Sequence, residues 1–67
     1  MWIKYKGASY QIISANIHEQ GENTSVWVGR PTGQSLKVFE SNNKEEAQEV
    51  LDAINFALEQ SIPVLEL

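Results

Sequence analysis

The segment NKEEAQEVLDAINFALEQ, residues 43–60, is the longest stretch with a clear period, and it decides the fold. At about 100° per residue, one stripe of a helix over this segment collects Ala47, Val50, Leu51, Ile54, Leu58 and Ser61. Asn43 is placed as the N-cap, with Glu46 at the third helical position as in a capping box. Pro63 stops the helix. The segment therefore predicts an amphipathic helix over residues 43–60 that closes one face of a sheet.

The residues before the helix read as short β-strands separated by polar, glycine-containing turns. We expect strands at residues 2–6, 10–18, 24–29 and 35–40, joined by connections so short that neighbouring strands must be antiparallel. The tail over residues 62–67 alternates in polarity, so it can add an edge strand, cover the helix end or reach a partner. The predicted fold is α+β, a single small domain over residues 1–67. It has a four-stranded antiparallel β-meander and one C-terminal amphipathic α-helix packed on one face.

The small size of the chain points to self-association. It has 67 residues and no cysteine, and His18 is its only histidine. A domain of this size buries only about 60% of the surface that its unfolded chain exposes. Without disulfides or a closed zinc site, self-association is the remaining way to gain stability. We therefore expect a homodimer, with no metal and no cofactor.

The formal net charge of −4 argues against a general polyanion binder. No apolar run approaches the roughly 18 residues of a membrane span. The first residues, MWIKYKG, lack the apolar core and the cleavage site of a signal peptide. We expect a cytoplasmic protein with no membrane partner.

Because side chains alternate across a strand, each predicted strand divides into two faces. The apolar face that meets the helix collects Ile3, Tyr5, Ile13, Ala15, Ile17, Val26, Val28, Leu36 and Val38. The opposite face collects Trp2, Lys4, Lys6, Tyr10, Ile12, His18, Trp27, Lys37 and Phe39, with Arg30 at its rim. A β-bulge in any strand would exchange part of this division. The pattern predicts an aromatic and basic sheet face on the side away from the helix.

Three interpretations of this face are open. Two sheets stacked in a homodimer would bury its aromatic side chains, or the tail and the lysine stems would cover them within one chain. Alternatively, the face would bind single-stranded nucleic acid by stacking bases between basic side chains. The residues that would do so are Trp2, Tyr10, Trp27, Phe39, Lys4, Lys6 and Lys37. The acidic helix and the small number of basic residues disfavour nucleic acid.

The outer side of the helix carries one large apolar residue, Phe56, among acidic ones. Ala53 and Ala57 lie beside it and are small enough for another backbone to approach. We expect this ridge either to contact another molecule or to be covered by residues 63–67. The same side is acidic and suits a basic partner, because it carries Glu45, Glu49, Asp52 and Glu59.

No pattern in the sequence carries catalysis. Glu19 follows His18 in a predicted strand, so the two side chains point to opposite faces. The serines lack the Gly-x-Ser-x-Gly elbow, and residues 29–33 lack the Lys-Ser/Thr that follows a phosphate-binding loop. We expect no catalytic residues and no enzymatic activity.

The run Phe39-Glu40-Ser41, followed by Glu45-Glu46-Ala47 and then by Leu51 and Ile54, carries a resemblance. It resembles the ending of small uncharacterised bacterial and phage proteins that have a β-meander and one C-terminal helix. In this chain Asn42-Asn43-Lys44 lengthens the turn. The resemblance implies a bacterial or phage source and a non-enzymatic domain, and it assigns no functional residues.

The sequence thus predicts a small non-enzymatic protein-interaction module that self-associates. The alternatives are single-stranded nucleic-acid binding and an acidic regulator or inhibitor of a basic partner. The candidate interaction surface comprises Trp2, Tyr10, Trp27, Phe39, Lys4, Lys6, Lys37, Phe56, Ala53 and Ala57.

Overall fold

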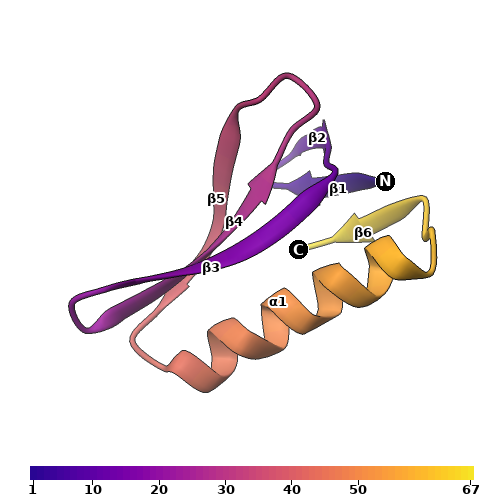
Figure 1. Ribbon diagram of the computed structural model, residues 1–67. Coiled ribbons are helices and arrows are strands. Elements are labelled where there is room, and N and C mark those ends of the chain that lie inside the picture. Colours follow the sequence, from indigo (N-terminus) through magenta and orange to yellow (C-terminus); the bar gives the residue numbers. More distant parts are fainter.

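The computed structural model describes residues 1–67 as six strands and one helix (Figure 1). The elements are β1 (Trp2–Tyr5), β2 (Ala8–Gln11), β3 (Ser14–Gln20), β4 (Asn23–Gly29), β5 (Ser35–Ser41), α1 (Lys44–Glu59) and β6 (Val64–Glu66). The α+β class is therefore confirmed. The single four-stranded meander is wrong, because the strands form two three-stranded sheets and a strand follows the helix.

Sheet A has the strand order β2-β1-β6. A two-residue turn of Lys6 and Gly7 joins β1 to β2, and both residues have positive φ, 48° and 79°, as a type I′ hairpin turn requires. On the other side of β1, the tail forms β6 and pairs in parallel, with Ile3 opposite Leu65. The tail thus takes the first of its three expected placements, that of an edge strand.

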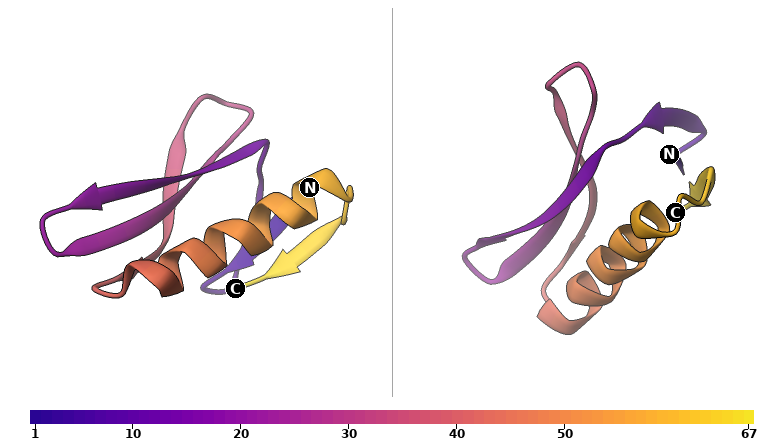
Figure 2. Two further views of the ribbon diagram at one scale, coloured as in Figure 1. Left: turned by 60° about the horizontal axis from the view of Figure 1, so that its bottom comes forward. Right: turned by 45° about the vertical axis from the view of Figure 1, so that its right-hand side comes forward.

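Sheet B has the antiparallel order β3-β4-β5 and is the part of the predicted meander that stands. Gly21, with φ of 62°, opens the turn between β3 and β4. After β4, the N–H of Gly33 donates to the carbonyl of Arg30 at 2.9 Å and closes the turn that leads to β5. Figure 2 shows α1 lying along one face of sheet B, with sheet A toward the C-terminal end of the helix.

The strand expected over residues 10–18 is broken between Ile12 and Ile13. The N–H of Ile12 donates to the carbonyl of Met1, and the N–H of Ile13 donates to the carbonyl of Gly29, both at 2.9 Å. Adjacent residues therefore bond to different sheets. Ile12 is 1% exposed and lies in the core, whereas Ile13 is 63% exposed. Both were assigned to the wrong face, because alternation does not continue through the bend between two sheets.

Two aromatic residues expected on the outer face lie on the inner side instead. In β5 a bulge places Val38 as an extra residue, so that Phe39 opposes Val26 and packs against the same core. In β2 Tyr10 opposes Ile3 and shares its inner face. The outer placements of Tyr10 and Phe39 were therefore wrong.

Asn43 is the N-cap of α1, as predicted. Its Oδ1 accepts from the N–H groups of Glu45 at 3.0 Å and of Glu46 at 3.4 Å. The Glu46 carboxylate does not return to the Asn43 N–H as a capping box would require. Instead, that N–H donates to the Ser41 hydroxyl at 3.0 Å, and the hydroxyl donates to Glu46 at 3.2 Å. Ser41 therefore links the strand end to the first turn of the helix.

The helix ends before Pro63 in a backbone motif. The N–H of Ile62 donates to the carbonyl of Ala57 at 2.9 Å, and that of Ser61 donates to Leu58 at 3.3 Å. These two bonds define a Schellman motif. Ser61 occupies its left-handed position with φ of 54°. The chain then reverses into β6.

The core joins sheet A, sheet B and α1. Ile3 comes from β1, Val26 and Val28 come from β4, and Ile54 comes from α1, all with no exposed surface. Ala57 is 1% exposed, which corrects its predicted place on the outer ridge, because it follows Ile54 by three residues and shares its face. No buried side-chain nitrogen or oxygen lacks a hydrogen-bond partner. No helix of the structure has the length and apolar character that a membrane crossing requires.

Candidate interaction surface

The aromatic and basic face predicted from the sequence is divided between the two sheets. Trp2 and Lys4 lie on the outer face of sheet A, where β1 pairs with β2 and β6. Trp27 and Lys37 oppose each other on the outer face of sheet B. The ten predicted residues therefore do not form one surface, although the two tryptophans remain on outer faces as expected.

The most exposed apolar residues of sheet A gather around Trp2. Trp2 and Val64 are direct neighbours in the parallel ladder and are 46% and 44% exposed. Every residue of this outer face is exposed: Trp2, Lys4, Ser9, Gln11, Val64 and Glu66. Beside it lies a hollow of about 330 Å³ lined by Met1, Trp2, Leu58, Ser61, Ile62 and Pro63. We call Trp2, Val64 and this hollow the Trp2 surface.

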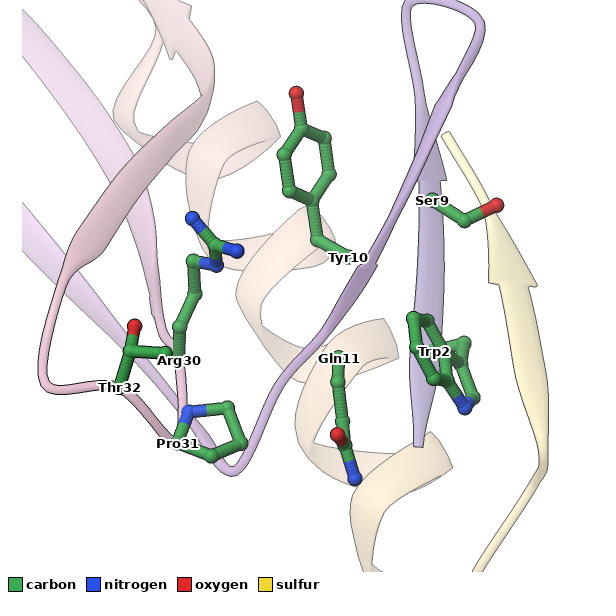
Figure 3. Close-up of a pocket in the computed structure, with 7 residues that line it drawn as sticks. All are labelled: Trp2, Ser9, Tyr10, Gln11, Arg30, Pro31 and Thr32. Carbon is green, nitrogen blue, oxygen red and sulfur yellow. The ribbon is translucent and has the colours of Figure 1, made fainter.

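Trp2 also borders a second hollow of about 170 Å³, which we call the Trp2–Arg30 hollow. Its lining consists of Trp2, Ser9, Tyr10, Gln11, Arg30, Pro31 and Thr32 (Figure 3). The Arg30 guanidinium lies 5.4 Å from the centre of the Tyr10 ring, within the range of a cation–π contact. One of its nitrogens donates to Gln34 Oε1 at 3.1 Å. No acidic residue lines this hollow.

The outer face of sheet B carries a third hollow of about 300 Å³, lined by Asn16, His18, Trp27 and Ser35. In the ladder, Asn16 and Lys37 flank Trp27 on its two sides. This face therefore combines one half-buried indole with polar side chains and one lysine.

The ion pairs reduce the basic character that the sequence suggested. Lys4 pairs with Glu66 at 3.7 Å, Lys37 pairs with Glu40 at 3.4 Å, and Lys44 pairs with Glu19 at 2.6 Å. Lys6 has no carboxylate partner and lies 5.3 Å from the centre of the Tyr5 ring. The remaining basic side chain is Arg30, and it is the only Lys or Arg side chain that lines a hollow.

The ion pair between Lys44 and Glu19 also changes the pKa of Lys44. The hydrogen bond from Lys44 to Glu19, together with the charge of that carboxylate, raises the pKa of the Lys44 ammonium above its ordinary value. The pair joins the start of α1 to the end of β3. Both side chains are largely exposed, so the pair contributes little to stability.

On the outer side of α1, Phe56 is 58% exposed, and the tail does not cover it because the tail is paired with β1. Ala53 is exposed beside it, as predicted. The flanking carboxylates are Asp52, four residues before Phe56, and Glu59, three residues after it, which places all three side chains on one ridge. We call these three residues the Phe56 ridge.

Sequence reasoning missed the contribution of the tail to the Trp2 surface. Val64 was noted only as part of an alternating tail, and its place beside Trp2 depends on a parallel pairing with β1. Arg30 was expected at the rim of the aromatic face, but its contact with Tyr10 brings it beside sheet A.

His18 lies on the outer face of sheet B, and no three His, Cys, Asp or Glu side chains are grouped to hold a metal.

No protein-family profile matches this chain, and neither curated proteins nor solved structures give a match. The resemblance to small bacterial and phage proteins therefore stays a prediction. The surfaces themselves are the only basis for a function.

Proposed function

We propose that this chain is a small non-enzymatic interaction module that self-associates through the Trp2 surface. The observation that supports the proposal is the pairing of Trp2 with Val64, both nearly half exposed, on a sheet face whose residues are all exposed. Tryptophan is enriched at the centre of protein interfaces, because one side chain buries a large area with few rotatable bonds.

The balance between core and surface favours a partner. Only 10 of 67 residues are buried, and the chain exposes 4534 Å². A standard interface covers about 800 Å² on each partner, which is less than a fifth of this surface. Burying Trp2 and its apolar neighbours would add to the small core at about 25 cal/mol per Å² of apolar surface, before the costs of association.

Sedimentation velocity over a concentration series tests this proposal. We expect the wild type to form a dimer or larger assembly at high micromolar concentration and to dissociate on dilution. Trp2→Ser should shift the equilibrium toward the monomer. Ile13→Ser is the control, because Ile13 is also a large apolar residue and is 63% exposed but lies outside the Trp2 surface. A wild type that stays monomeric throughout would refute self-association.

Single-stranded nucleic acid is a second candidate, supported by the hollow around Trp27. The indole lies between Asn16 and Lys37 in the ladder, an arrangement that offers a stacking ring with a polar and a basic neighbour. The pairing of Lys37 with Glu40 reduces the charge available for phosphate. In a Trp2→Phe variant, Trp27 is the only tryptophan, and oligonucleotide should quench it less as salt rises. Unchanged fluorescence at low salt rejects this candidate.

A further inference from the structure

We infer that self-association is head-to-tail, with the Phe56 ridge of one copy docked in the Trp2–Arg30 hollow of the next. This inference rests on the proposed function and adds the geometry of the contact, because Trp2 borders this hollow as well as the one beside Val64. It commits to a second copy of this chain as the occupant of the hollow. The two surfaces are different and each copy carries one of each, so the contact repeats from copy to copy into a ring or a filament unless a two-fold axis closes two such contacts in a dimer.

The hollow offers what an acidic, aromatic ridge needs. Arg30 has five N–H donors, and only one hydrogen bond to the side chain of Gln34 is formed within the chain. The Tyr10 ring holds the guanidinium from one side. Figure 3 shows Arg30 and Trp2 at opposite ends of the hollow, with Gln11 between them. A carboxylate can therefore pair with Arg30 while an aromatic ring contacts Trp2.

The Phe56 ridge has the complementary pattern. Phe56 is the most exposed aromatic residue of the chain at 58%. Asp52 and Glu59 flank it on the same side of α1, and neither forms an ion pair within the chain. Asp52 accepts one hydrogen bond from Gln48 at 2.8 Å, which leaves further acceptor positions on the carboxylate. The ridge thus presents a ring between two carboxylates that lack a cationic partner.

The pairing of the basic side chains within the chain favours contact between these two surfaces. Ion pairs within the chain occupy Lys4, Lys37 and Lys44. Lys6 lies at the tip of the β1–β2 hairpin, outside every hollow. Arg30 is therefore the one Lys or Arg side chain that lines a hollow, which it shares with Trp2, and it keeps donors that are not used within the chain. In either of the other two hollows, the carboxylates of the Phe56 ridge would meet no Lys or Arg side chain.

Charge reversal on each side tests the contact. Arg30→Glu should weaken wild-type self-association at least about tenfold, because it sets like charges against each other. The double variant Asp52→Arg/Glu59→Arg should weaken it similarly. An equimolar mixture of the two variants should associate again, since each negative hollow then meets a positive ridge and each native hollow meets a native ridge. Lys6→Glu is the matched control, with the same charge change outside the hollow, and should leave the Kd within about twofold of the wild type.

The possible results separate this inference from the proposed function. A monomeric wild type removes both. A wild type that associates while both charge variants keep its Kd shows that another surface is used, which overturns the head-to-tail contact and leaves self-association intact. Weakening in each variant without recovery in the mixture also overturns the contact. Circular dichroism of both variants should match the wild type, because none of the three substituted side chains belongs to the buried core.

Discussion

Ala53 and Ala57 lie one helical turn apart in α1, yet Ala53 is exposed and Ala57 is 1% exposed. The boundary of the core therefore runs between them. We expect Ala57→Leu to cost about 1–3 kcal/mol of unfolding free energy, because extra methylenes must fit a packed interior. Ala53→Leu should change it by less than about 0.5 kcal/mol. Urea unfolding measures both, and equal effects would mean that the helix is rotated from the position described.

Ser61 should be a site where glycine stabilises the protein. Its φ of 54° is in the left-handed region, which L side chains disfavour and which ends helices most often with glycine. Ser61→Gly should raise the unfolding free energy by about 0.5–1 kcal/mol. Gln60→Gly is the control, because Gln60 has φ of −86° and gains nothing from glycine. Thermal unfolding of the two variants measures the difference. A Ser61→Gly variant less stable than the wild type would contradict the left-handed position of Ser61 in the Schellman motif.

Asn43 should contribute more to stability than its neighbour Asn42. Asn43 Oδ1 accepts two backbone N–H groups at the start of α1, whereas no side-chain hydrogen bond is formed by Asn42. We expect Asn43→Ala to cost about 1 kcal/mol, the usual value for an N-cap. Asn42→Ala should cost less than about 0.5 kcal/mol. Denaturant unfolding of both variants gives the difference, and a reversed order would place the cap elsewhere.

The Lys44–Glu19 pair should be visible in a titration. Its hydrogen bond and charge raise the pKa of Lys44 in the folded state. The stabilisation that follows is present below the unfolded pKa, near 10.5, and is lost as pH rises through the higher folded value. In an NMR titration, Glu19→Gln should lower the Lys44 pKa, and added salt should do the same. The same Lys44 midpoint in both proteins would show that the pair does not form.

The helix and sheet B were predictable because their signals are local. The predicted helix ends lie within one residue of those of α1. They follow from the N-cap Asn43, the spacing of Ala47 and Ile54, and Pro63. The hairpin at Gly21 followed from a single glycine between two strands. Such features depend on neighbours a few positions away, which a sequence displays directly.

Sheet A was not predictable because it depends on distant pairings. Ile12 and Ile13 are both isoleucine, so no change of residue type marks the bend between them. Only their backbone hydrogen bonds show it, because Ile12 bonds to Met1 in one sheet and Ile13 bonds to Gly29 in the other. The bulge that turns Phe39 inward likewise arises from its register with Val26. The prediction of the candidate surface is therefore right in part. Trp2 and Phe56 are exposed as predicted, whereas Tyr10, Phe39 and Ala57 face the core.

The parallel pairing of β1 with β6 sets the order in which the chain can complete its fold. Sheet B and α1 are built from neighbouring segments, but Ile3 cannot gain its partner Leu65 until residues 64–66 have left the ribosome. Until then sheet A consists of the β1–β2 hairpin alone, and a two-stranded sheet is only marginally stable in water. β1 is then an unpaired strand edge that carries Trp2, a form in which strands of other copies can pair with it.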